Sequence, residues 1–464
     1  MNPRRLAPFV AAVGISVPGI CLHLLPVSLP PPAVALVAGA AIMGAAFVLL
    51  WACDAAQADI SQALAVAIVA LIAVSPEYAV DMYFTWMAGK HPQGDYAQYA
   101  IANMTGANRL LIGVAWALIA FLHWVKTRRA VRLGAERRTE LMFLALATAY
   151  AFLIPIKGSL TWFDGFVFLS IYAWYIVLTS RRPATDVEVH GPAELLLALP
   201  TARRRAATWS LFAFAGIAIL ANAEAFSEGL IGTGEMLRVN KFLLVQWLAP
   251  LASEAPEFIV AIMFVLRGNA ALALGSLLCA KLNQWTLLVG MIPGVYAVSH
   301  GSLQHAIPMN AIQLHEILLT AAQSLLAVLM MANLRLTVGN ALLLFALFIG
   351  QLVSPVFIAA NPATFPWTMN GDEIHKLYTL MYIVASATIL FCEPARLRRL
   401  REDLRSAQLA PRVGEDSALV AVRAASEGDS PNGRRCSASH HLPPVQRRSV
   451  CGSCAFRGRV CAGG

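Results

Sequence analysis

Runs of about 20 apolar residues recur along most of this chain, and each is long enough to cross a lipid bilayer as a helix. Only 13% of the 464 residues are charged, and 58% are hydrophobic, whereas water-soluble chains carry about a quarter charged residues. Because a helix satisfies its own backbone hydrogen bonds in lipid, we expect an all-α polytopic membrane protein. The runs predict about twelve helices, centred near residues 16, 42, 70, 112, 147, 170, 218, 252, 284, 322, 348 and 384.

Basic residues are concentrated before the first expected helix and after the fourth, sixth and last. These residues are Arg4, Arg5, Lys126, Arg128, Arg129, Arg132, Arg137, Arg138, Arg181, Arg182, Arg203, Arg204, Arg205, Arg396, Arg398, Arg399 and Arg401. All four segments lie on one side if both termini are cytoplasmic, as the positive-inside rule requires. We therefore expect a multi-pass protein of the cell membrane. Its net charge of +9 then reflects orientation and contact with anionic lipids, not nucleic-acid binding.

A Pro-Glu pair occurs twice in the middle of an apolar run, as Pro76-Glu77 and as Pro256-Glu257. A carboxylate at that depth costs roughly 2.5–3.5 kcal/mol on insertion scales. The proline removes a backbone donor, which leaves a carbonyl one turn earlier for a neighbouring group, a water or an ion. The repetition predicts a duplicated ion site.

The expected topology sends the helix that carries Glu77 outward and the helix that carries Glu257 inward. The two copies are thus inverted, as in many secondary transporters, whose sites lie near the midplane between the repeats. We predict an extra N-terminal helix in 1–32, a first half in 33–180 with its repeat at about 60–120, and a basic cytoplasmic linker in 181–206. The second half follows in 207–360 with its repeat at about 240–295, then an extra helix in 361–395 and a disordered basic tail in 396–464. For the first apolar run, a signal sequence is the alternative to a spanning helix.

Each Pro-Glu helix is followed by a segment of small and polar residues, 102–110 in the first half and 275–283 in the second. Small residues allow helices to approach closely. Asn103 and Ser276 supply neutral oxygens there, and together with carboxylates these are the hard ligands that Na⁺ and Ca²⁺ prefer. Helix packing is the alternative role for both residues.

These motifs resemble the Ca²⁺/cation antiporter superfamily, of sodium/calcium exchanger type. Its members have two inverted repeats, each with a Gly-Thr-Ser-x-Pro-Glu motif and a Gly-Asn/Asp-x-x-Gly-Ser-Asn motif. The resemblance implies two five-helix halves, with one further helix at each end of this chain. It implies that Glu77 and Glu257 are the paired ion-binding glutamates and that Asn103 is a ligand. Further matches to the motifs are Pro76, Gly106, Asn108, Pro256 and Gly275.

The chain departs from the family motif at several ligand positions. Ala73 and Val74 replace the first Thr-Ser pair, so two hydroxyl ligands are lost. In the second copy Ser253 fits the Thr position, but Glu254 replaces the Ser. We include Ser253 and Glu254 among the candidate ion ligands.

Lys281 stands where the family has Asn. An ammonium at that depth needs a partner, so we expect it to pair with Glu254, Glu257 or Asp81. Asp81 follows Glu77 by one turn and lies on the same helix face. Two roles are open for Lys281. It forms a structural ion pair, or it takes part in transport by permanently compensating the charge of one carboxylate.

Other polar residues in the apolar runs allow two interpretations each. Glu224 and Glu228 line an access path or approach the outer interface. Arg109 is expected to be paired or to extend its head group to the interface. Interhelical hydrogen bonding is the favoured role of Gln246, Asn283 and Gln284. In the tail, Cys451 and Cys454 with two nearby histidines match no standard zinc spacing.

We therefore predict a secondary active antiporter, not an enzyme, that exchanges Ca²⁺ or a similar metal ion for Na⁺ or H⁺ by alternating access. It needs no cofactor, since small cations are its transported substrates and lipids its surroundings. A Na⁺/H⁺ exchanger on the same scaffold is the alternative, favoured by the lost hydroxyls and by Lys281. A non-transporting sensor or a membrane enzyme is a distant third, because no nucleophile elbow or phosphate loop occurs in the apolar runs.

Overall fold

The computed structural model describes residues 3–25, 28–59, 75–180, 192–360 and 371–393. In these ranges the chain is helical almost throughout. Its first half contains α1 (Pro3–Leu24), α2 (Pro31–Ala56), α4 (Ser75–Lys90), α5 (Tyr96–Leu110), the π-helix η1 (Leu111–Trp116), α6 (Ala117–Thr127), strand β1 (Val131–Arg132), the 3₁₀-helix η2 (Ala135–Arg137), α7 (Arg138–Ala151), α8 (Leu153–Lys157) and α9 (Trp162–Ser180). The second half contains α10 (Ala193–Leu197), α11 (Thr201–Leu237), α12 (Lys241–Leu266), α13 (Ala270–Asn283), the π-helix η3 (Gln284–Leu288), α14 (Val289–His300), α15 (Ala311–Met331), strand β2 (Arg335–Leu336), α16 (Val338–Ala360) and α17 (Gly371–Cys392).

The expected fold class is confirmed. Ten helices in the described ranges are long and apolar enough to cross a membrane. Eleven of the twelve expected centres fall inside helical segments, and the twelfth, near residue 70, lies outside the described residues. The tail from residue 396 with its cysteines, residues 181–191 of the expected linker and the pair Ala73-Val74 also lie outside them.

Contacts between loops place alternate helix ends on opposite faces of the bundle. On one face β1 pairs with β2, and Lys126 at the end of α6 donates to the carbonyl of Leu266 at the end of α12. On the other face a bridge joins Leu160 to Ile307. The basic segment after α6 therefore lies opposite the loop between α14 and α15, as the charge pattern predicts.

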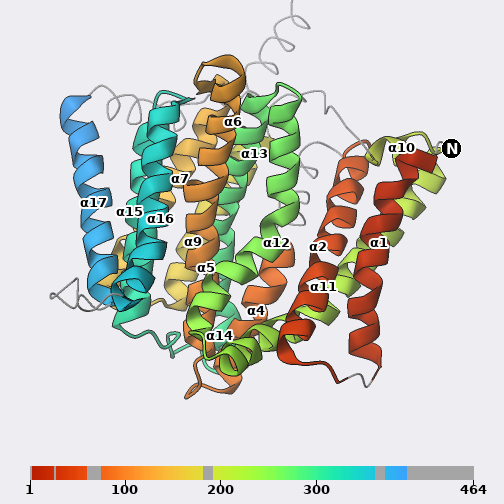
Figure 1. Ribbon diagram of the computed structural model, residues 1–464, viewed down its shortest axis with the longest axis horizontal. Coiled ribbons are helices and arrows are strands. Elements are labelled where there is room, and N and C mark those ends of the chain that lie inside the picture. The colour runs from red at the N-terminus through yellow and green to blue at the C-terminus, as the bar shows by residue number, and fades with distance from the viewer. Residues whose placement is uncertain (1–2, 26–27, 60–74, 181–191, 361–370, 394–464) are drawn as a thin grey trace, which may run out of the picture. The chain divides into compact units, whose positions relative to one another are not determined.

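The helices at the two ends of the chain pack on different parts of the bundle. α1 packs on α2 and α11, whereas α17 packs on α15 and α16 (Figure 1). α11 begins at Thr201, inside the range expected for the linker, and takes Arg204 into its first turn. Arg204 donates to both carboxylate oxygens of Asp59, at 2.8 and 2.7 Å. These hydrogen bonds hold the pKa of Asp59 below its ordinary value.

The two long helices that follow the Pro-Glu segments break at matching places. The helix α5–α6 passes through η1 just after Leu110, and α13–α14 passes through η3 just after Asn283. A π-helical turn inserts one extra residue into the ladder and re-aims the side chains around it, and such turns are frequent at functional sites. In η1 and η3, Trp116 and Trp285 are almost completely buried.

Candidate functional site

One buried amide connects a carboxylate of the first repeat to a carboxylate of the second. Nε2 of Gln284 donates to Oε2 of Glu77 at 2.7 Å and to Oε1 of Glu254 at 2.9 Å. Glu77 and Glu254 are each 2% exposed, and Gln284 is fully buried. The two carboxylate oxygens can therefore lie no farther apart than the sum of those two distances.

Local sequence signals position the three elements that meet there. Pro76 lies in the first turn of α4, where a missing backbone donor costs little, and Glu77 follows it. Asn240 caps α12, the helix of Glu254, by accepting from the backbone of Phe242. Asn269 caps α13 by accepting from Leu272. Gln284 is the first residue of η3, directly after α13.

The second-repeat acid that shares a donor with Glu77 is Glu254, three residues before the expected partner Glu257. Glu257 is half-buried, and its Oε2 is enclosed with no hydrogen-bond partner in the described part of the chain. Because residues three apart lie on the same helix face, both acids of α12 border the same region. The direct pairing of Glu77 with Glu257 stays a prediction.

Asp81 and Asn103 form a second polar contact one turn from Glu77. Nδ2 of Asn103 donates to Oδ1 of Asp81 at 3.1 Å, and both side chains are buried. Within the described ranges, four buried oxygens here have no hydrogen-bond partner: Oδ2 of Asp81, Oδ1 of Asn103, Oε1 of Glu77 and Oε2 of Glu254. Leaving buried acceptors unsatisfied costs about 1–3 kcal/mol each, more for charged groups. The arrangement therefore has an excess of hard oxygen acceptors, which a proton, a water or a cation can satisfy.

Lys281 meets an amide and an aromatic ring rather than the carboxylate that we expected. Its Nζ donates to Oδ1 of Asn108 at 2.6 Å and lies 4.4 Å from the ring centroid of Trp285. The side chain is fully buried. An ion pair of Lys281 with Glu254, Glu257 or Asp81 does not occur among the contacts of the described residues, so hydrogen bonding and a cation–π contact hold the ammonium.

Two predicted ligands, Ser276 and Ser253, have hydroxyls that donate within their own helices. Ser276 is exposed, and its hydroxyl donates to the carbonyl of Ala273 in its own helix. Ser253 is buried, but its hydroxyl donates to Ala249 and Pro250 within α12. In both cases a serine hydroxyl bonds back to its own helix, an alternative always open to serine.

The predicted small residues serve close packing. At Gly106 an added Cβ would lie 1.8 Å from the carbonyl oxygen of Gln246, so α5 and α12 touch there through the backbone. At Gly275 an added Cβ would lie 2.9 Å from Nε of Arg137. Pro256 is buried inside α12. The Gly106 contact brings the helix of Asn103 and Asn108 against the helix of Glu254.

The sequence interpretation missed a buried ion cluster beside the site. Arg109 pairs with Glu316 of α15, and its guanidinium lies 5.1 Å from the ring centroid of Trp247 of α12. The other oxygen of Glu316 lies 3.1 Å from Nδ1 of His375 on α17. An acid in the apolar run of α15 was the available signal, since ionisable residues within membrane segments are usually paired and functional.

Glu228 of α11 is tied to the core helices. Its Oε1 accepts from the hydroxyl of Tyr83 on α4 at 2.9 Å and from that of Tyr96 on α5 at 2.8 Å. Glu224 is exposed. Glu228 is therefore hydrogen-bonded to the core helices, whereas Glu224, one helical turn before it, is exposed on the surface.

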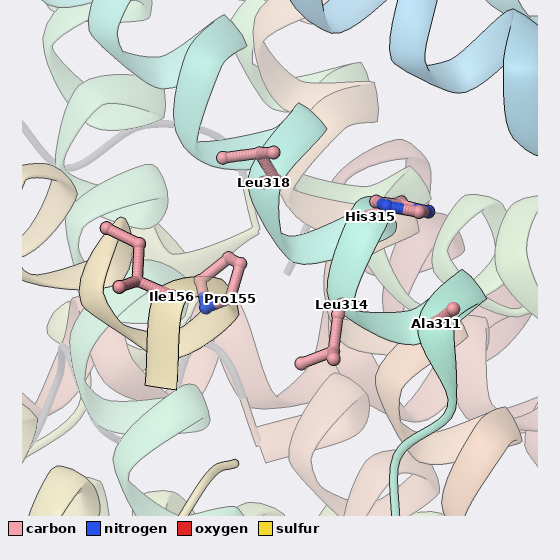
Figure 2. A pocket seen from close by; sticks show the side chains of 6 residues that line it. All are labelled: Pro155, Ile156, Ala311, Leu314, His315 and Leu318. Carbon is pink, nitrogen blue, oxygen red and sulfur yellow. The ribbon is translucent and has the colours of Figure 1, made fainter. Parts of the chain in front are cut away.

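A surface pocket lies between α8 and α15 (Figure 2). It is lined by Pro155, Ile156, Ala311, Leu314, His315 and Leu318. In the described part of the chain, no three His, Cys, Asp or Glu side chains form a ready-made metal site.

A helical bundle of two inverted halves, with acids from both halves joined at one buried amide, defines a membrane cation antiporter. The family model described as sodium/calcium exchanger protein matches residues 31–181 and again 207–357. The chain belongs to this family and thus to the Ca²⁺/cation antiporter superfamily, whose members are exchangers and not enzymes. α1 precedes the first matched range and α17 follows the second.

The comparison with solved structures finds similarity to two exchangers. The chain is 41% identical to a protein described as the H⁺/Ca²⁺ exchanger CAX, with a TM-score of 0.80, and the match covers 87% of this chain and 98% of that one. It is 20% identical to the sodium-calcium exchanger NCX_Mj, with a TM-score of 0.45, over 75% of this chain and 99% of that one. No curated protein sequence matches the chain.

Proposed function

We propose that this protein exchanges Ca²⁺ for H⁺ across the cell membrane, with both termini in the cytoplasm. The observation that carries the proposal is the amide of Gln284, which joins Glu77 of one repeat to Glu254 of the other. Carboxylates that share one neutral donor in a buried place repel each other when both are charged. Either protons or a divalent cation relieve that repulsion, so the two compete for the same oxygens.

The choice of H⁺ over Na⁺ rests on the ligand set. Ala73 and Val74 replace the Thr-Ser pair of the family motif, and Ser276 is exposed, which leaves fewer neutral hydroxyl ligands for Na⁺. The relative described as an H⁺/Ca²⁺ exchanger shares 41% of its residues with this chain. Both observations favour protons as the counter-ion.

Exchange follows from the electrostatic cost of moving an empty site. An empty, charged pair of carboxylates is expensive to carry through a low-dielectric barrier, whereas the protonated or Ca²⁺-loaded pair is not. Alternating access then requires one group of helices to move against the other around the site. α2 and α11 pack together along their length, and Glu228 is where α11 bonds to Tyr83 and Tyr96 of the core helices.

Purified full-length protein in proteoliposomes tests the proposal. Vesicles with an acidic interior should accumulate ⁴⁵Ca²⁺, and vesicles loaded with Na⁺ at equal pH should not. Glu77→Gln and Glu254→Gln should each abolish the uptake, because each removes a carboxylate bonded to Gln284. Uptake driven by Na⁺ alone, or no uptake under either gradient, would overturn the proposal.

Na⁺/H⁺ exchange is the second candidate, and Lys281 is the observation that favours it. An ammonium that bonds Asn108 and interacts electrostatically with Glu254 and Glu77 would lower the negative charge available to a divalent ion. In this case ²²Na⁺ should enter vesicles with an acidic interior while ⁴⁵Ca²⁺ does not, in the same preparation.

A further inference from the structure

The cluster of Arg109, Glu316 and His375 contains a titratable group that the exchange mechanism does not use. Arg109 and Glu316 have no exposed side-chain surface, whereas the side chain of His375 is 15% exposed. His375 is therefore the member of the cluster with exposed surface, and it lies near the beginning of α17, whereas the ion pair behind it is enclosed. Histidine is the side chain that ordinarily changes charge between about pH 5 and 8.

The cluster connects α17 to the helices of the cation site. Glu316 lies in the second turn of α15, which begins with a capping box formed by Asn310 and Gln313. Arg109 follows Asn108 directly on α5, and Asn108 accepts the hydrogen bond of Lys281. Arg109 also lies over Trp247 of α12, the helix that carries Glu254.

Glu316 is a charged side chain in direct contact with His375, and the other groups on the helices around His375 are the following. α16, which also packs on α17, has no acidic or basic residue along Val338–Ala360. On α17 itself, Tyr378 and Tyr382 follow His375, while Glu373 and Lys376 flank it. On α15, His315 precedes Glu316 and is one of the residues that line the pocket beside α8 (Figure 2).

We propose that His375 binds a regulatory proton that is not transported, and that this proton weakens cation binding through Glu316 and Arg109. With His375 neutral, the cluster has one positive and one negative charge. With His375 protonated, Glu316 is shared between two cations and the cluster becomes net positive one residue from Asn108. A positive charge at that place disfavours a cation at the neighbouring site. The sensing end of the cluster lies on the face of the Leu160–Ile307 bridge, because Glu316 is near the start of α15.

His375→Asn tests the proposal, since its amide nitrogen can replace Nδ1 in the contact with Glu316 but cannot acquire a charge. In proteoliposomes of known orientation, the KM for Ca²⁺ is measured at about pH 5.5 and about pH 8 on the face of His375, with the other side held constant. The ratio of the two KM values should fall about five-fold or more relative to the unmodified protein, a typical size for coupling between two sites. The ratio of H⁺ to Ca²⁺ exchanged should stay unchanged. His305→Gln, on an exposed loop histidine, is the matched control and should keep the original KM ratio.

An unchanged KM ratio in folded His375→Asn protein would overturn the proposal, as would a changed exchange ratio. His375→Gln serves as a second neutral variant, and loss of folding in both variants would mean that the contact is structural only. The inference rests on the proposed Ca²⁺ exchange, so a second measurement distinguishes failure of the proton site from failure of the exchange proposal. The difference in Tm between the unmodified protein and His375→Asn should change between the same two pH values even if no Ca²⁺ is moved. A constant difference would refute the proton site alone.

Discussion

Lys281 and Asn108 occupy equivalent positions in the two repeats, and in the folded protein Nζ of Lys281 donates to Oδ1 of Asn108 at 2.6 Å. The related positions of α5 and α13 thus meet each other directly. Where the family motif has two amides, this chain has an amide and an ammonium, so the site is asymmetric in charge.

Lys281→Asn should increase the number of positive charges bound per cycle by about one, because the variant removes an ammonium from a buried site. The reversal potential of ⁴⁵Ca²⁺ flux in proteoliposomes measures this exchange ratio. Lys281→Arg, which keeps the charge, is the control and should leave the ratio unchanged. Equal ratios in all three proteins would show that Lys281 has no part in coupling.

Gln284→Leu should reduce Ca²⁺ transport at least ten-fold. The change removes two hydrogen bonds to carboxylates, and hydrogen bonds to charged groups contribute about 1.5–3 kcal/mol each. Initial rates of ⁴⁵Ca²⁺ uptake over a concentration series give the KM and the maximal rate. Gln351→Leu, at a buried glutamine of α16, is the matched control. If both leucine variants lose activity equally, the effect of Gln284 is not specific to the site.

Glu254→Gln should impair transport more than Glu257→Gln, because Glu254 shares Gln284 with Glu77 whereas Glu257 is only half-buried. We expect no measurable uptake for the first variant and an increase of about ten-fold or less in the KM for the second, as for removal of a single weaker contact. Side-by-side uptake assays on equal amounts of folded protein decide the order. The reverse order would restore the pairing of Glu77 with Glu257.

Gly106→Ala should destabilise the protein by about 1–3 kcal/mol or more, the usual cost of overpacking a tight interior. The new Cβ would lie 1.8 Å from the backbone carbonyl of Gln246, which cannot move without shifting α12. Gly216→Ala in α11 is the control, since nothing lies within 4 Å of its added Cβ and alanine favours helix. Tm in detergent should fall for the first variant and stay equal or rise for the second. A Tm for Gly106→Ala equal to that of the unmodified protein would contradict the close contact.

The sequence predicted the helices well because a bilayer imposes one length on every span. Charge at the helix ends then determined the alternation of faces, which the β1–β2 pairing and the Leu160–Ile307 bridge confirm. The first turn of α11 was assigned to a linker instead, because Arg203, Arg204 and Arg205 resemble a loop when helix packing is unknown. In the structure the bond from Arg204 to Asp59 holds this turn in place.

The buried polar contacts were harder to predict, because each joins residues far apart in the chain. Gln284 was interpreted as an interhelical hydrogen-bond partner, and it is one, but its partners are the two acids. Arg109 was expected to be paired, yet Glu316 and His375 lie more than two hundred residues away from it. A lysine can be satisfied by an amide and an aromatic ring as well as by an acid, so the partner of Lys281 could not be deduced from charge alone.

The sequence alone determined that the chain forms membrane helices in two inverted halves with acids at matching places, since span length, charge bias and motif repetition are local properties. Only the tertiary structure decided which acid of α12 shares a donor with Glu77. Glu254 and Glu257 are three residues apart and lie on one face of α12. Which of them reaches Gln284 therefore depends on how α12 is rotated about its axis relative to α13. The close contact of Gly106 with Gln246 and the π-helical start at Gln284 set that geometry, and neither can be read from a list of residues.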